Sequence, residues 1–211
     1  MTAPVHEPHT TADELPDPDE FLWQTWKAMD PPEGLRAEII GGSIEVWPHG
    51  RVDHGVISSQ LYQELTLYLV EQSSPYVVNA CMYVVHDRKV WIPDAFVAPA
   101  DVDGFVSEDD IGIEARCVAL VAEVVALGHD GAQRDRDRKR QAYARAGIPV
   151  YVLIDPHDAH GTVTILSSPS PAEAVYAAET RVPYGTEVTI PEGPAKGLVI
   201  GEEITGPPRK R

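Results

Sequence analysis

The sequence predicts an α/β (α+β) fold in which helices flank a mixed central sheet and a β-rich extension follows. Ile57, Leu61, Leu65 and Leu69 recur every four residues, which indicates an amphipathic helix over 52–72. The almost continuously apolar run CVALVAEVVA is typical of a central strand that is covered on both faces. A charged helix follows it and leads to a second apolar run, PVYVLIDP. This order favours a sheet with helices on its faces.

The N-terminal half begins with a predicted helix that starts near Asp19 and ends before Pro31 and Pro32. The run LRAEIIGGSIEVW then predicts a hairpin that turns at Gly41-Gly42. After the helix over 52–72, the runs YVVNACMYVVH and KVWIPDAFVAP predict a second hairpin around Asp87 and Arg88.

The C-terminal half continues with a polar, acidic loop over 99–115 and then the central strand. A charged helix is expected over 132–146, with Gly147 directly after its end, where glycine is favoured. The runs TVTILSS, AEAVYAAETRV and TEVTIP come after PVYVLIDP and predict β-rich structure at the edge of the sheet.

A chain of 211 residues supports one sizeable core, and we expect a single domain over 19–205. We expect a disordered acidic tail over 1–18, which has few large apolar groups, and a disordered basic tail over 206–211. No apolar run is long enough for a membrane span, and the N-terminus does not resemble a signal peptide. These features predict a cytoplasmic protein that does not associate with membranes.

The formal net charge of -16 argues against tight, non-specific binding to nucleic acids, which usually depends on a basic surface. The basic residues are nevertheless unevenly distributed. Six of the 17 lie on the charged helix: Arg134, Arg136, Arg138, Lys139, Arg140 and Arg145. A solvated helix face would explain this cluster as well as a phosphate-binding role would.

Three acidic residues and one lysine, Glu38, Asp94, Glu123 and Lys139, are the candidate catalytic residues. If Asp94 and Glu123 lie on neighbouring strands, their carboxylates repel each other by about 4 kcal/mol at a separation of ~4 Å. Such a pair usually holds a divalent cation or shares a proton. The alternatives are an Asp94 that hydrogen-bonds the backbone and a Glu123 that forms a structural ion pair with an arginine.

A magnesium ion on two carboxylates would suit phosphodiester hydrolysis, because it activates water and neutralises phosphate charge. Lys139 would stabilise the transition state or orient the water. Glu38 is either an additional ligand or an ordinary strand carboxylate. Asp135 lies four residues before Lys139, so an ion pair between them along the helix is the alternative to a catalytic Lys139.

Pro93-Asp94, followed about thirty residues later by Glu123-Val124-Val125, resembles the PD-(D/E)XK nuclease superfamily. The segments AEIIGGSIEV, PDAFV, LVAEVV and DRDRKRQAYARAGIPVYVLIDP resemble, more narrowly, the bacterial Uma-two (Uma2) family of putative restriction endonucleases. The resemblance implies a restriction-endonuclease-like fold and a magnesium-dependent endonuclease acting on DNA, with Mn²⁺ able to substitute. It also implies metal ligation by Asp94, Glu123 and the backbone carbonyl of Val124.

The sequence departs from the superfamily pattern at Val125, where a lysine is expected two residues after the glutamate. Lys139 on the next helix is the natural replacement. The missing lysine and the acidic composition also favour a second interpretation, a weak or inactive nuclease fold that serves as a binding or regulatory module. A third is a metal-dependent hydrolase of a smaller phosphate substrate. The sheet edge and the β-rich C-terminal segment predict a homodimer.

Overall fold

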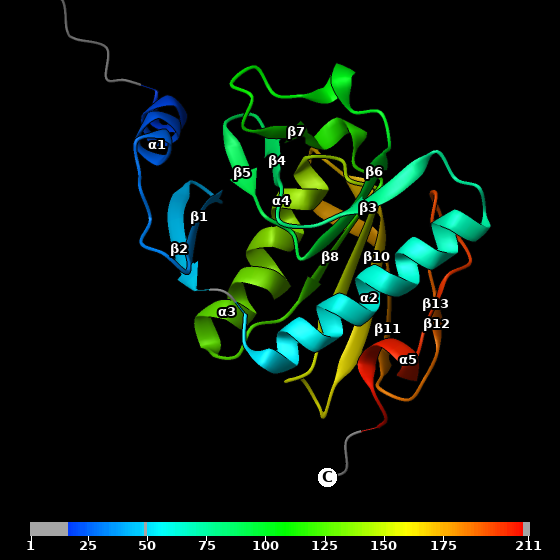
Figure 1. The fold of residues 1–211 in the computed structure, drawn as a ribbon. Coiled ribbons are helices and arrows are strands. Elements are labelled where there is room, and N and C mark those ends of the chain that lie inside the picture. The colour runs from blue at the N-terminus through cyan, green and yellow to red at the C-terminus, as the bar shows by residue number, and fades with distance from the viewer. Residues whose placement is uncertain (1–16, 49, 209–211) are drawn as a thin grey trace, which may run out of the picture.

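In the computed structural model, which describes residues 17–48 and 50–208, six strands form a mixed central sheet in the order β11-β10-β9-β8-β6-β3 (Figure 1). Neighbours β8 and β9 are parallel, and the other pairs are antiparallel. The strands are β3 (Tyr76–Asn79), β6 (Ala95–Pro99), β8 (Leu120–Val124), β9 (Val150–Asp155), β10 (Thr162–Ser170) and β11 (Val175–Pro183). The predicted mixed sheet is therefore confirmed.

A second sheet of five strands, in the order β2-β1-β5-β4-β7, was not predicted. It contains β1 (Leu35–Ile40), β2 (Ser43–Pro48), β4 (Tyr83–His86), β5 (Lys89–Trp91) and β7 (Gly112–Glu114). The β1–β2 hairpin turns at Gly41 and Gly42 as predicted, with φ values of 57° and 88° that suit glycine.

The predicted hairpin around Asp87 and Arg88 is correct only for β4 and β5. Both parent runs are split between the two sheets, because β3 pairs with β6 in the central sheet. The left-handed backbone of Cys81, with φ of 59°, interrupts the first run, and Pro93 lies between β5 and β6 in the second. Alternating apolar residues could not reveal this division.

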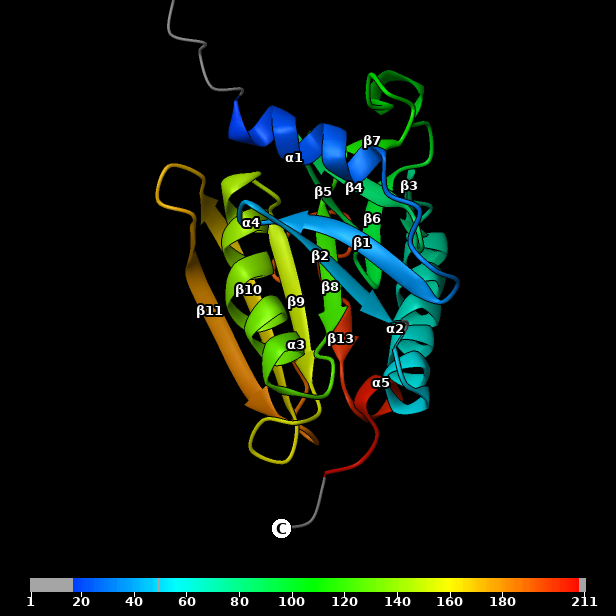
Figure 2. The same ribbon diagram turned by 90° about the vertical axis from the view of Figure 1, so that its left-hand side faces the viewer.

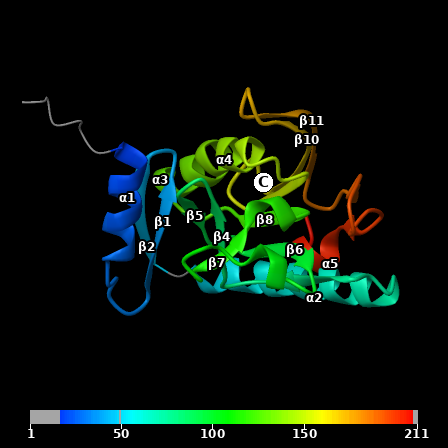
Figure 3. The same ribbon diagram turned by 90° about the horizontal axis from the view of Figure 1, so that it is seen from above.

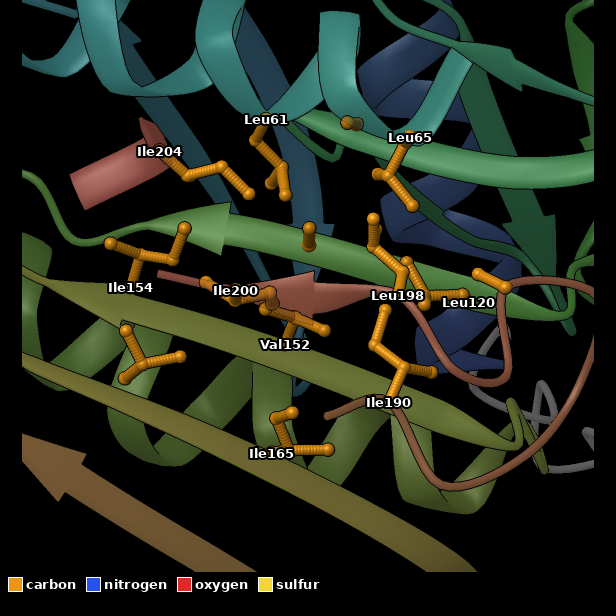
Figure 4. Close-up of a cluster of buried hydrophobic side chains, with 14 of the residues drawn as sticks. Leu61, Leu65, Leu120, Val152, Ile154, Ile165, Ile190, Leu198, Ile200 and Ile204 are labelled. Atoms are coloured by element: carbon orange, nitrogen blue, oxygen red, sulfur yellow. The ribbon is translucent and has the colours of Figure 1, made fainter. Parts of the chain in front are cut away.

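Helix α2 (Val52–Glu71) packs its buried Ile57, Leu61, Leu65 and Leu69 against one face of the central sheet, as predicted. The C-terminal elements β12 (Val188–Thr189), β13 (Val199–Ile200) and α5 (Glu202–Thr205) complete this core. Figure 4 shows Leu61 and Leu65 directed toward the sheet, with Leu61 beside Ile204 and Leu65 above Leu198.

A helical segment connects the parallel strands β8 and β9 and covers the other face of the sheet (Figures 2 and 3). It consists of α3 (His129–Gln133), a π-helical segment η3 (Arg134–Lys139) and α4 (Arg140–Arg145). The segment begins three residues before the predicted start at 132. Gly147, with φ of 73°, follows its last turn as expected.

Helix α1 (Pro18–Lys27) packs its buried Trp23 and Trp26 against the second sheet. Asp17 caps it by accepting the backbone N–H of Asp19, so the helix begins one residue before the predicted start near Asp19, and Pro18, which was assigned to the tail, is its first residue. Residues 1–16 and 209–211 of the two predicted tails lie outside the described residues. The 3-10 helices η1 (Asp103–Phe105) and η2 (Ala115–Cys117) occur within and after the predicted 99–115 loop.

Candidate active site

Lys139 lies between two buried glutamates. Its Nζ is 2.9 Å from Oε1 of Glu38 and 2.8 Å from Oε1 of Glu123. The side chains of Lys139 and Glu38 are each 2% exposed, and that of Glu123 is 3% exposed. Strand β1, strand β8 and the end of η3 thus bring three of the predicted site residues together. Buried charges require this kind of mutual compensation.

Asp94 lies immediately before β6, where the pairing between β6 and β8 ends at Ala95 and Ala122. Its Oδ2 accepts the backbone N–H of Val124 at 2.8 Å. The Asp94 carboxylate is therefore held against the peptide that joins Glu123 to Val124. The backbone hydrogen bond that was an alternative to a ligand role exists, and it also brings Asp94 to Glu123.

Asp135 is not the ion-pair partner of Lys139 that the spacing along the helix allowed. Its carboxylate instead binds the guanidinium of Arg134, at 2.6 Å from Nε, and accepts the backbone N–H of Ala126. Asp135 therefore connects the start of the π-helical segment to the chain that follows β8 through these hydrogen bonds. A π-helical turn is uncommon and often marks a functional site, and Lys139 is the last residue of this one.

The electrostatic environment shifts the pKa values of Glu123 and Asp94 in opposite directions. Burial, reinforced by the charges of Asp94, Asp135 and Glu38, raises the pKa of Glu123 to about 7, although Lys139 opposes this. Burial would also raise the pKa of Asp94, but the hydrogen bond and charge of His54 hold it below its usual value. Burial would lower the pKa of Lys139, but the neighbouring Glu123 and Glu38 raise it above its usual range. Lys139 is therefore a cation at neutral pH.

Residues 21–199 match the model of the Uma2 family, which is described as a putative restriction endonuclease. The chain belongs to the Uma2 family. No curated protein matches the sequence. A solved structure, titled as a putative nuclease belonging to DUF820 from Anabaena variabilis, superimposes with a TM-score of 0.67 at 16% identity. The similarity covers 88% of this chain and 97% of that one, and it shows a shared restriction-endonuclease-like fold.

Three residues that contact the acids were not among the predicted site residues: His54, Tyr143 and Arg36, whose Nη2 lies 3.7 Å from Oδ1 of Asp94. His54 on α2 places Nε2 3.0 Å from Oδ2 of Asp94. Tyr143 on α4 is buried, and its hydroxyl donates to Oε1 of Glu123. Helix spacing contained signals for two of them, because His54 precedes the buried Ile57 by three residues and Tyr143 follows Lys139 by four.

The His54–Asp94 contact predicts a pH-dependent stability in the metal-free protein. Burial would lower the pKa of His54, but Asp94 raises it above its usual value. The stabilisation of the folded state by the His54–Asp94 contact is therefore complete below about pH 6.5, and it is lost as the pH rises through the raised pKa of His54. The pKa of Asp94 is lowered, so this carboxylate stays ionised throughout that range.

We expect His54→Gln to lower the melting temperature more at pH 5.5 than at pH 8.5 when EDTA is present. The difference between the two pH values should be about 2–4 °C, since a charged hydrogen bond is worth about 1 kcal/mol more than a neutral one. Differential scanning calorimetry of both proteins at each pH measures it. An equal loss at both pH values would contradict a protonated His54 beside Asp94.

Proposed function

We propose that this protein is a Mg²⁺-dependent endonuclease that hydrolyses DNA phosphodiester bonds. The observation that carries the proposal is the position of Asp94, whose carboxylate rests on the Glu123–Val124 peptide in a chain of the Uma2 family. Two carboxylates from different segments, buried beside a cationic lysine, are the donor set that metal-assisted hydrolysis requires.

The ligands of the metal would be Asp94, Glu123 and the backbone carbonyl of Val124. In a strand, the N–H and C=O of one residue point to the same side. Because the N–H of Val124 points to Asp94, its carbonyl faces the same side of β8. Lys139 and Tyr143 both bind Oε1 of Glu123, so neither of these contacts occupies Oε2.

These donors fit magnesium better than zinc. Within residues 17–48 and 50–208, no group of three or more His, Cys, Asp or Glu side chains is arranged to hold a metal ion. Zinc sites usually need three or four such side chains, whereas Mg²⁺ binds one or two carboxylates and keeps several waters. Mn²⁺ shares the preference for oxygen ligands and is expected to substitute. When bound, the ion would lower the pKa of a coordinated water and neutralise charge on the phosphate oxygens.

Three residues near the proposed metal ligands would stabilise charge on the phosphate and hold the side chains of the site in position. Lys139 is protonated, so it would stabilise the negative charge that develops on the phosphate rather than accept a proton. Glu38 accepts both the backbone N–H of Ile92 at 2.7 Å and the ammonium of Lys139, so its proposed role is to hold Lys139 in place. Tyr143 would orient the Glu123 carboxylate through its hydrogen bond.

A binding or regulatory module with a nuclease fold is the second candidate. It is favoured by the Lys139–Glu123 contact, which balances the charge of the glutamate without any metal. The net charge of -16 supports the same interpretation, and it would also suit a hydrolase of a smaller phosphate substrate.

Removing the metal separates these candidates. We expect cleavage of oligonucleotide DNA in Mg²⁺ or Mn²⁺, complete loss of cleavage in EDTA, and recovery when excess Mg²⁺ is returned. Gel electrophoresis measures cleavage, and isothermal titration calorimetry measures metal binding. Metal binding without cleavage of any DNA would support the binding module or the small-substrate hydrolase instead.

The homodimer also remains a proposal. Strand β11 is an outer strand of the central sheet and is mostly exposed, so its free edge could pair with a second copy. Light scattering coupled to size exclusion should give twice the 23.1 kDa mass of the chain. A monomer at micromolar concentration would refute the homodimer.

No helix in the described part of the chain is long and apolar enough to span a membrane.

A further inference from the structure

Two cavities share His54 in their walls. The first, of about 440 Å³, is lined by residues that include Trp47, Arg51, Leu127 and Arg134, and we call it the Trp47 cavity. The second, of about 420 Å³, has Asp94 in its wall. Both share Arg36, Gly50 and His54, so they form neighbouring compartments beside the proposed metal ligand. Each has the size of a small-molecule site.

The Trp47 cavity has hydrogen-bond donors without partners. Nε1 of Trp47 and Nε of Arg36 are both buried, and neither has a hydrogen-bond partner among the described residues. Both groups can only donate. Since buried donors in native proteins are nearly always paired, two such donors on residues that line one cavity favour a ligand that supplies acceptor oxygens or ring nitrogens, although both atoms are covered by protein in this conformation.

The wall of the cavity carries three arginines and two aspartates, Asp53 and Asp130, and each arginine lies within 4 Å of a carboxylate. Arg36, Arg51 and Arg134 line it, and the guanidinium of Arg134 lies 4.6 Å from the centre of the Trp47 ring. Leu127, which is 60% exposed, adds an apolar surface to the same wall. A combination of positive charge, an aromatic ring and apolar side chains suits a nucleotide, which joins an anionic phosphate to a flat base.

The depth of the acidic centre restricts how DNA could reach it. The side chain of Asp94 is only 6% exposed and lies in the wall of the second cavity. A base that remains stacked and paired within a duplex cannot enter a cavity, so enzymes that hold a base in one take it out of the stack. The net charge of -16 also disfavours a duplex, which carries one negative charge per ~1.7 Å of its axis.

We propose that the Trp47 cavity holds one unpaired nucleotide next to the phosphate to be cleaved, so that the substrate is single-stranded DNA rather than continuous duplex. This inference rests on the proposed function for the position of the scissile phosphate. The donors of Trp47 and Arg36 bind the oxygens or ring nitrogens of the unpaired nucleotide, and Arg51 attracts the adjoining phosphate.

Binding tests the inference separately from cleavage. Fluorescence anisotropy in EDTA and 50 mM salt compares a labelled twelve-nucleotide single strand with a blunt duplex of the same sequence. We expect the single strand to bind at least fivefold more tightly. Trp47→Phe, which removes the N–H and keeps an aromatic ring, should weaken single-strand binding at least fivefold. Arg51→Gln should weaken it about threefold, and its side chain is 73% exposed, so the substitution does not endanger folding.

Trp23→Phe is the matched control. Nε1 of Trp23 donates to Asp109, and neither residue lines either cavity. It should leave single-strand binding unchanged. Equal or tighter binding of the duplex, undetectable binding of the single strand, or unchanged binding by both Trp47→Phe and Arg51→Gln would overturn the inference. Single-strand binding without cleavage in Mg²⁺ would support the nucleotide site and refute the nuclease, whereas cleavage with a duplex preference would support the nuclease and refute the nucleotide site.

Discussion

Replacing Lys139 with methionine is expected to lower the free energy of unfolding by about 3–5 kcal/mol. The substitution preserves most of the side-chain volume but leaves Glu38 and Glu123 buried without the ammonium that contacts both. Two carboxylates that share a dry site cannot both remain ionised cheaply, so the folded state must take up a proton or admit water. Urea denaturation monitored by circular dichroism at pH 7 measures the loss.

Lys27→Met provides the matched control. Lys27 pairs with Asp109 at 3.4 Å, but its side chain is 28% exposed and that of Asp109 is 42% exposed. An ion pair at the surface contributes at most about 1 kcal/mol, so the control should change stability no more than that. If Lys139→Met were equally mild, the three charges would not form the buried, mutually dependent cluster described above.

Glu123→Gln is expected to reduce kcat/KM for DNA cleavage at least ~1,000-fold. Loss of a ligand carboxylate removes several kcal/mol of metal-dependent transition-state stabilisation, and each ~1.4 kcal/mol is tenfold in rate. Glutamine keeps the shape of the side chain and an oxygen that can accept from Lys139 and Tyr143. Initial rates on a labelled oligonucleotide in Mg²⁺ give the ratio.

Glu45→Gln controls for the removal of a buried glutamate in the same region. Glu45 lies opposite Glu38 in the β1–β2 pairing and forms an ion pair with Arg138, outside the proposed ligand set. Its substitution should change kcat/KM by less than about threefold, since it removes no group that acts on the phosphate. If wild type and Glu123→Gln shared one trace rate, the enzyme proposal would fail.

The local parts of this fold were predictable because their causes are local. The four-residue spacing from Ile57 to Leu69 defines the buried face of α2, and the apolar residues around Glu123 define a strand covered on both faces. The pairing of β3 with β6 joins residues about twenty apart across the β4–β5 hairpin. No local pattern records which of several similar strands will be neighbours, so the second sheet was missed.

In the candidate site, too, features with local causes were predictable and features that depend on tertiary structure were not. Glu123 was recognisable because a carboxylate in a wholly apolar run needs compensation. The choice between Asp135 and Glu123 as the partner of Lys139 depended on tertiary structure, because it required the distance from the helix to β8. The contact between His54 and Asp94 joins two elements that are separated in the sequence by strands β3, β4 and β5. Helix periodicity could indicate only that His54 faces inward.

Anomalous diffraction from a crystal soaked in Mn²⁺ tests the proposed metal centre most directly. We expect one strong peak about 2.2 Å from the carboxylates of Asp94 and Glu123 and from the carbonyl of Val124, with waters completing six-fold coordination. Lys139 should still contact Glu38 in that structure. A crystal in millimolar Mn²⁺ with no peak at this position, and with Asp94 still bound to His54, Arg36 and the backbone of Val124, would contradict the metal-dependent nuclease.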